Sequence, residues 1–269
     1  MPLLRTQHSV LPGFTLSFAL SVLFICLVIL VPLSGLAIHV SQMSWAQYWG
    51  VITDPRSLAS FRVTLLAAAG ASGINAVVGL LLAWVITRYR FPGRRLMDAL
   101  VDLPFALPTA VAGLTLSALF AANGWLGQWF EAIGISVAYT PLGIMIAMSF
   151  TSLPFVVRAV QPVLEDLTPD VEEAAATLGA SPMASFFRVV LAQLMPALLT
   201  GTALAFTRSL GEYGAVIFIA GNMPFETEII SLLVNIRLEE YDFAAASALA
   251  SVILGASLVL LFGIQMVQG

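Results

Sequence analysis

The sequence predicts an all-α polytopic membrane protein with about six transmembrane helices. Three observations predict it. Hydrophobic residues make up 59% of the 269 residues and charged residues only 10%, whereas soluble domains average roughly 45–50% apolar and about 25% charged residues. The apolar residues gather in runs of the length that crosses a bilayer, which is about 20 residues at 1.5 Å rise per residue. Five of the six runs have a charge-free core.

The six runs lie in one transmembrane domain, residues 1–269. The predicted spans are residues 14–40, 63–87, 100–122, 139–160, 194–220 and 243–267. The first is too long for the apolar part of a secretory signal, and no convincing small-residue cleavage site follows it, so we expect a retained helix. Pro104 and Pro108 are expected to break the third span. The fifth is interrupted by Arg208 and Glu212.

The basic residues predict the orientation of these spans. All 11 are arginine, and lysine is absent. Short loops rich in basic residues stay in the cytoplasm, and we count seven arginines on one side, three on the other and Arg208 within the membrane. The seven are Arg5, Arg88, Arg90, Arg94, Arg95, Arg158 and Arg188, and the three are Arg56, Arg62 and Arg237. Both termini are therefore expected in the cytoplasm.

The aromatic residues of the opposite loops have two interpretations. As amphipathic rings they suit the level of the lipid headgroups, where tryptophan and tyrosine anchor membrane proteins. The alternative is that some of them contact a binding protein. These residues are Trp45, Tyr48, Trp49, Trp125 and Trp129.

Several kinds of functional site are excluded because the residues they need are absent from the sequence. Cys26 is the only cysteine, which excludes a disulfide framework and a thiolate metal site. The only histidines, His8 and His39, are expected on opposite sides of the membrane. A Walker A loop needs a lysine, so this chain has no such ATP-binding loop and any ATP hydrolysis would need another chain. We expect no catalytic residue, metal or cofactor on this chain, and no nucleic-acid partner.

The segment 162–193, between the fourth and fifth spans, has a helix-turn-helix pattern. Thr168 can cap a first helix that begins with Pro169, and Gly179 can end it in the left-handed conformation. Ser181 then begins a second helix. Such a first helix could lie on the membrane or dock to a protein, and its acids disfavour anionic lipid. Its small apolar face, at i, i+3, i+4 and i+7, consists of Val171, Ala174, Ala175 and Leu178.

This segment resembles a known family. The pattern Glu173-Ala174-Ala175-x3-Gly179-x9-Val189 resembles the EAA signature of ABC importer permeases. The resemblance implies the ABC type I importer permease fold and a first helix that fits a cleft on the ATPase subunit. By the same resemblance, Glu173, Ala174, Ala175 and Gly179 make the coupling contact. Ala192 stands where the family usually has proline, so the second helix can continue into the fifth span.

Further stretches resemble one branch of this family, the sulfate/thiosulfate permeases, and within it the T (also called U) subunit. They are residues 10–16 (VLPGFTL), 43–49 (MSWAQYW), 102–113 (DLPFALPTAVAG) and 208–215 (RSLGEYGA). A molybdate or tungstate permease is the first alternative, and an ion-gradient-driven transporter is the second.

Permeases of this branch usually continue into a basic tail, whereas this chain ends at Gly269, so a truncated sequence is one interpretation of that end.

The resemblance also implies a set of partners in the bacterial inner membrane. They are a homologous second permease subunit that forms a heterodimer with this chain, two ATPase subunits that bind ATP and Mg, and a periplasmic sulfate/thiosulfate-binding protein. Membrane lipid surrounds the spans.

Arg208 and Glu212 lie four residues apart in the fifth span, where an uncompensated charge costs at least a few kcal/mol. Three interpretations stay open: an internal ion pair, an anion pathway or gate that uses Arg208, and pairing with the second permease. Pro104, Pro108 and the glycines after Arg208 could expose backbone to a cavity or allow close helix packing. After the fifth span, a short helix is expected from an apolar stripe that comprises Ile229, Leu232, Leu233 and Ile236.

Overall fold

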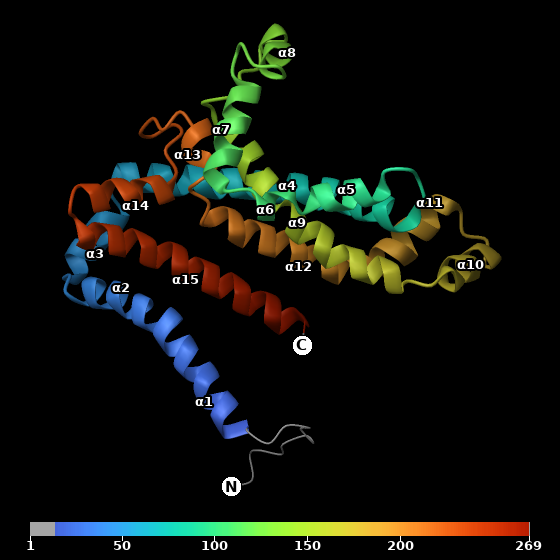
Figure 1. Cartoon of the computed structure of the whole chain (residues 1–269), viewed down its shortest axis with the longest axis horizontal. Helices are drawn as coiled ribbons and strands as arrows, with labels where there is room; N and C mark the ends of the chain where they lie inside the picture. Colours follow the sequence, from blue (N-terminus) through green and yellow to red (C-terminus); the bar gives the residue numbers. More distant parts are fainter. Residues whose placement is uncertain (1–13, 269) are drawn as a thin grey trace.

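The computed structural model describes residues 14–268, so the expectations for Arg5, His8 and Gly269 lie outside the described residues. Within this range the chain is α-helical and has no β-strand. Three long helices form its core and run side by side along the longest axis of the molecule (Figure 1): α4 (Pro55–Arg88), α9 (Pro141–Asp166) and α12 (Leu191–Leu210).

Small side chains let the core helices approach closely. Ala67, Ala68 and Ala71 of α4 are buried against Ile144, Ala147 and Met148 of α9. In a chain surrounded by lipid, such close packing is the main attraction between helices. The start of α4 is fixed by Asp54, whose Oδ2 accepts hydrogen bonds from the backbone amides of Arg56 and Ser57 at 3.0 and 3.4 Å.

The first helical stretch lies apart from this core. It consists of α1 (Phe14–Ile25), a π-helical turn (Cys26–Leu30) and α2 (Val31–Ser41), and no residue of it is buried. It diverges from the bundle toward the N-terminus in Figure 1. Helix α15 (Phe243–Gln268) packs between α2 and α12.

The two ends of the bundle carry different elements. One end, called here the α10 end, holds α10 (Pro169–Thr177), α11 (Pro182–Ser185) and a second π-helical turn (Phe186–Val190) (Figure 1). The opposite end, called the α14 end, holds α3 (Trp45–Ile52) and α14 (Ile230–Glu239). The apolar stripe at 229–236 therefore belongs to a short helix, as predicted, and Leu232 and Leu233 are buried.

Five helical stretches of the described chain are long and apolar enough to cross a membrane. They are Phe14–Ser41, Pro55–Arg88, Pro141–Asp166, Pro182–Leu210 and Phe243–Gly263. The predicted third span, 100–122, is instead three short helices, α5 (Arg94–Val101), α6 (Leu103–Ala106) and α7 (Thr109–Phe120). The chain turns between α6 and α7 because Leu107 and Pro108 are extended. Helix α7 then leads to α8 (Gly127–Ala132), which projects from the bundle (Figure 1).

The fifth span also differs from its predicted bounds of 194–220. At its start, α11, the π-helical turn and α12 form one apolar helical stretch from Pro182 to Leu210, so the helix does continue through Ala192. At its other end, α12 stops at Leu210, and α13 (Val216–Ile219) follows after a non-helical turn. The turn forms because the Glu212 side chain, rather than a helical carbonyl, accepts the hydrogen bond of the Ala215 amide.

Candidate functional site

The two interrupted spans meet at their interruptions. We call this contact the junction and define it as residues 107–113 and 211–215. A Cβ atom on Gly113 would overlap the carbonyl oxygen of Ala215, and one on Gly214 would overlap the Thr109 side chain. Close packing, one of the two interpretations of the glycines after Arg208, is therefore what the structure contains at Gly214, and Gly113 packs in the same way. A Cβ atom on Gly211 would meet nothing within 4 Å. Pro108 directs the chain into α7 at this point.

The intramembrane ion pair lies beside the junction. Nη1 of Arg208 is 2.6 Å from Oε2 of Glu212, although this oxygen has no well-directed hydrogen bond. Oε1 of Glu212 accepts from the Ala215 amide at 3.0 Å. The ion pair, one of the three interpretations, is present, but Glu212 lies outside the helix, because α12 ends at Leu210. The Glu212 side chain is 1% exposed and that of Arg208 is 36% exposed.

A buried hydrogen-bond chain places this pair along the bundle. Ser209 Oγ donates to Ser152 Oγ at 3.2 Å, and Asn75 Nδ2 donates to the same oxygen at 2.9 Å. Ser152 lies about 16 Å from the start of α9, a helix about 39 Å long at 1.5 Å per residue. Arg208 is therefore close to the middle of the bundle's length.

The EAA-like segment forms a helix-turn-helix at the α10 end. Gly179 ends α10 with φ +84°, as predicted for a left-handed stop, and Ser181 Oγ accepts from the Ala184 amide at 3.3 Å. Thr168 occupies the N-cap position of α10, but its side chain makes no capping hydrogen bond.

The predicted contact residues of this segment are mostly uncovered. Glu173, Ala174 and Gly179 are exposed, and Ala175 is buried. The predicted apolar face is thus only partly packed, since Leu178 is 88% exposed. A groove of about 700 Å³ runs between α10 and the next helix, and its lining includes the Val171, Ala174 and Ala175 side chains.

Sequence reasoning missed the contact between this segment and α4. Nη2 of Arg88 lies 2.7 Å from Oε1 of Glu172, and the guanidinium carbon of Arg88 lies 5.4 Å from the ring centroid of Trp84. Arg88 was used only to predict orientation. A basic residue at the C-terminal end of a predicted span, beside an acidic loop helix, was the available signal.

Arg158 is a second residue whose role was missed. It lies within α9 and holds Asp102 with two hydrogen bonds, Nε to Oδ1 at 2.9 Å and Nη2 to Oδ2 at 2.6 Å. Its Nη1 also donates to Oδ1 of Asp98 at 2.6 Å. The bidentate contact fixes the chain at Asp102, between α5 and α6 and two residues before Pro104. The spacing of the two aspartates, i and i+4, was the sequence signal for a shared cationic partner.

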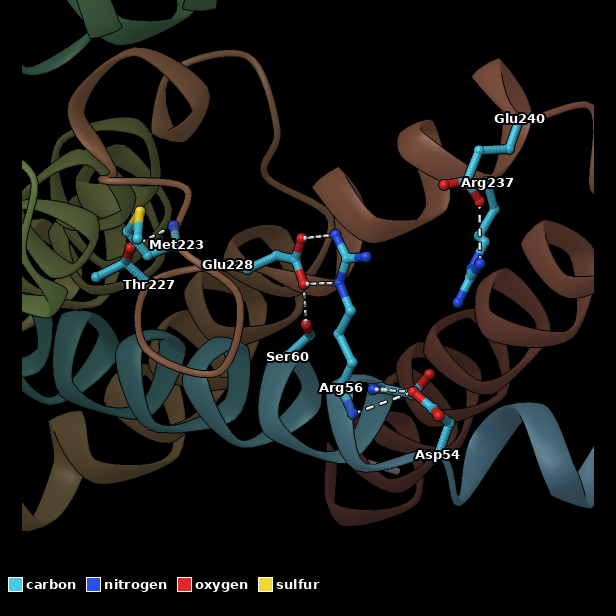
Figure 2. A network of polar contacts seen from close by, with 9 residues as sticks. Asp54, Arg56, Ser60, Met223, Thr227, Glu228, Arg237 and Glu240 are labelled. Atoms are coloured by element: carbon cyan, nitrogen blue, oxygen red, sulfur yellow. Dashed lines mark hydrogen bonds and ion pairs between the residues drawn. The ribbon is translucent and has the colours of Figure 1, made fainter.

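A third missed contact lies at the α14 end. Figure 2 shows Arg56 and Glu228 facing each other: Nε is 2.9 Å from Oε2 and Nη2 is 2.7 Å from Oε1. Ser60 Oγ donates to Oε2 at 3.1 Å, and the Glu228 side chain is 1% exposed. The residues are 172 positions apart, so no local pattern could have paired them. The segment before α14 is thereby attached to the first turns of α4.

Potential metal ligands do not cluster in the described residues. Within 14–268, no group of three or more His, Cys, Asp or Glu side chains is placed to hold a metal ion. Cys26, on the divergent first stretch, is a free thiol. The ion pairs of Arg56, Arg88 and Arg158 instead join segments that are far apart in the sequence.

Comparison with known proteins gives close relatives along most of the chain. It is 64% identical over 263 residues to the sulfate transport system permease protein CysT of Salmonella typhimurium and 63% identical over 263 residues to CysT of Escherichia coli. Each alignment covers 98% of this chain and 95% of the relative.

Solved structures share the fold at low sequence identity. A chain of a bacterial ABC transporter involved in the import of the acidic polysaccharide alginate matches with a TM-score of 0.74 at 15% identity, covering 93% of both chains. A chain of an amino acid ABC transporter matches with a TM-score of 0.55 at 16% identity, covering 79% of this chain and 92% of the other. The predicted all-α fold of ABC importer permeases is confirmed.

A family model defines the relationship. The model described as binding-protein-dependent transport system inner membrane component matches residues 75–268, which contain the junction and the α10 end. This chain therefore belongs to the family of binding-protein-dependent transport system inner membrane components, as a multi-pass permease subunit and not an enzyme.

Proposed function

We propose that this chain forms half of the translocation pathway of an ATP-driven importer for sulfate and thiosulfate. The observation that supports this proposal most strongly is the helix-turn-helix at the α10 end. Its residues Glu173, Ala174 and Gly179 are exposed in the described chain. An uncovered helix at the end of three packed helices suits a docking surface for an ATPase subunit. The names of the close relatives, sulfate transport system permeases, support the choice of anion.

The proposal includes the partners and the orientation. A homologous second permease, two ATPase subunits that hold ATP and Mg, and a periplasmic sulfate/thiosulfate-binding protein complete the importer. The α10 end faces the cytoplasm of the bacterial inner membrane, with both termini on that side, and the α14 end faces the binding protein. The arginine bias supports this orientation, since Arg88, Arg90, Arg94 and Arg95 all lie toward the α10 end.

Movement of the α10 end couples the ATPase to the transmembrane helices. When the ATPase subunits close and open, they displace α10 by its exposed face around Glu173 to Gly179. Helix α10 follows α9 and precedes the long stretch that contains α12, so its displacement reaches two core helices through the chain itself. Alternating access then results from movement of the packed core.

The pathway is proposed to pass the junction. Arg208 is far more exposed than its counterion Glu212, and it lies near the middle of the bundle, where a lone cation would attract a dianion strongly. Glu212 partly neutralises it, which keeps the anion from being trapped. Pro108 sets the break between α6 and α7 that forms the other wall of this region, and Pro104, the second residue of α6, is proposed to belong to the same wall.

Copurification tests the ATPase contact. Gly179→Asp places a side chain at φ +84° on the docking surface, so the variant is expected to lose the ATPase during purification of the complex. Gly93→Asp is the matched control, because Gly93 has φ +92° and open space around it but lies outside the coupling segment. Retention of the ATPase by Gly179→Asp, or its loss from both variants, would argue against docking at α10.

Uptake tests the role of Arg208. Arg208→Gln is expected to leave the complex assembled but to lower sulfate uptake at least tenfold, since one charge contact at this depth is worth more than about 1.4 kcal/mol. Arg62→Gln, which removes an exposed arginine without an ion pair among the described residues, serves as the control. Normal assembly with normal uptake in Arg208→Gln would exclude it from the pathway.

A further inference from the structure

Helix α4 carries an ion-paired arginine at each end. Arg56 is its second residue and Arg88 its last, and the helix between them is 34 residues, or about 51 Å, long. Arg88 contacts α10, and Arg56 contacts the segment 220–229 that leads into α14. One helix thus reaches both the proposed ATPase-docking element and the opposite end of the molecule.

The contact at the α10 end holds two elements at once. Arg88 donates to Glu172 on α10 while its guanidinium lies near the Trp84 ring, and the Trp84 ring meets the edge of Phe186 with centroids 5.2 Å apart. Phe186 begins the π-helical turn that leads into α12. Within residues 14–268, Arg88–Glu172 is the ion pair that joins α10 to a core helix.

The contact at the α14 end is bidentate, and its carboxylate is buried. Arg56 binds both carboxylate oxygens of Glu228, and Ser60 adds a hydrogen bond from the next turn of α4. A little further along, Thr64 Oγ1 accepts from the Ile230 amide at 2.9 Å. The segment 220–229 and the start of α14 are therefore attached to the first three turns of α4, and Figure 2 shows Glu228 beside Arg56 and Ser60.

The body of α4 suits the transfer of movement over this distance. Its one proline, Pro55, is the first helical residue, where proline does not interrupt the helix, and its buried positions recur along its whole length, from Ser57 to Ile86. A continuous helix packed in this way moves as one piece. The junction spans, by contrast, are broken at Pro108 and after Leu210 and cannot transmit an axial displacement in the same way.

We propose that α4 carries the displacement of α10 to the segment 220–229, with Arg88–Glu172 as the input contact and Arg56–Glu228 as the output contact. The inference rests on the proposed function, in which an ATPase moves α10. The four side chains are positioning residues: none needs to touch ATP or the anion. Exposed Met223 and Phe225 on the output segment would then change position when the ATPase changes state.

The input contact is tested in the reconstituted complex of both permeases, the ATPase subunits and the binding protein. The readout is the ratio of ATP hydrolysis with and without sulfate-loaded binding protein. Arg88→Gln is expected to lower this ratio about fivefold or more, in the range of ordinary coupling between sites. The double variant Arg88→Glu/Glu172→Arg should restore it, and Arg90→Gln, in which a neighbouring exposed arginine is lost, should leave it unchanged.

The output contact is tested by distance. Spin labels at Phe225, on the output segment, and at Ile133, beyond α8, are both at exposed positions, and their separation is measured by electron paramagnetic resonance with and without trapped ATP. The separation is expected to change with ATP in the parent complex and in Arg62→Gln. It should stop responding in Arg56→Gln and also in Arg88→Gln, which lies at the far end of α4.

The outcomes separate this inference from the proposed function. A parent complex without sulfate uptake or bound ATPase would contradict the proposed function itself. An active parent in which Arg88→Gln keeps both its ATPase ratio and its ATP-dependent distance change would overturn only the role of α4. Loss of the ATPase from the Arg88→Gln complex would also overturn it, because the contact would then serve docking instead of transmission.

Discussion

The junction and the coupling segment, residues 169–181, are both interruptions between long helices, but they are built in opposite ways. At the junction, Gly113 and Gly214 bring backbone and side chain into contact with no room for a Cβ atom. In the coupling segment, Gly179 has open space around it and Leu178 is 88% exposed. The junction is closed by contacts within the chain, whereas the coupling segment makes few contacts with the rest of the chain.

The difference separates two uses of glycine. Gly113 and Gly214 are needed for distance, because a larger residue would push two segments apart. Gly179 is needed for its positive φ, which turns the chain between two short helices. Substitutions should therefore destabilise the permease at the junction, and they should weaken partner binding at the coupling segment.

The largest effect on stability is expected at Gly113. Gly113→Ala forces a shift of the Ala215 carbonyl and should lower the free energy of unfolding by about 1–3 kcal/mol, as overpacking does. Unfolding of the detergent-solubilised permease, followed by circular dichroism, measures it. Gly73→Ala is the control, since its Cβ meets nothing within 4 Å. Equal stability of the two variants would show that the junction is loosely packed.

A smaller loss is expected for the hydrogen-bond chain beside the junction. Ser152→Ala removes the acceptor shared by Asn75 and Ser209 and should cost about 0.6–1.7 kcal/mol, the range for interhelical hydrogen bonds in membranes. Thr115→Ala, which loses only a bond to its own helix, should cost less in the same unfolding measurement. A larger loss in Thr115→Ala would contradict the view that this chain ties α4, α9 and α12 together.

The smallest effect on stability is expected at Leu178. Leu178→Ala should change the free energy of unfolding by less than about 0.5 kcal/mol, as exposed positions do. The same variant should retain less ATPase during copurification, because a partner would cover this side chain. Leu66→Ala, another exposed leucine but on α4, is expected to change neither quantity. Unfolding of Leu178→Ala at clearly lower denaturant would place Leu178 in the permease's own core.

The sequence predicted features that depend on near neighbours. Gly179 and Ser181 could be assigned because a helix stop and a cap are set by one or two adjacent residues. Pro108 predicted the break in the third span for the same reason, since proline acts on its own backbone and on the residue before it. The helical stretch through Ala192 also follows from local propensity.

Features that depend on distant neighbours could not be predicted. The end of α12 at Leu210 was missed although its cause is local: the Glu212 side chain accepts from the Ala215 amide three residues later, whereas the run of apolar residues continues to Ala220. Arg56 and Glu228 meet only because the segment before α14 returns to the start of α4. Arg158 was used only to predict orientation, because its partners Asp102 and Asp98 lie 56 and 60 residues earlier in the chain.

Substrate-dependent ATP hydrolysis tests the central claim most directly. The complete complex is reconstituted in lipid nanodiscs with its binding protein, and hydrolysis is measured with sulfate, thiosulfate, molybdate or no anion. The account predicts stimulation by sulfate and thiosulfate, at most weak stimulation by molybdate, and no stimulation when this chain carries Gly179→Asp. Stimulation by molybdate above that by sulfate would contradict the assigned substrate, and sulfate transport by this chain without any ATPase would contradict the account as a whole.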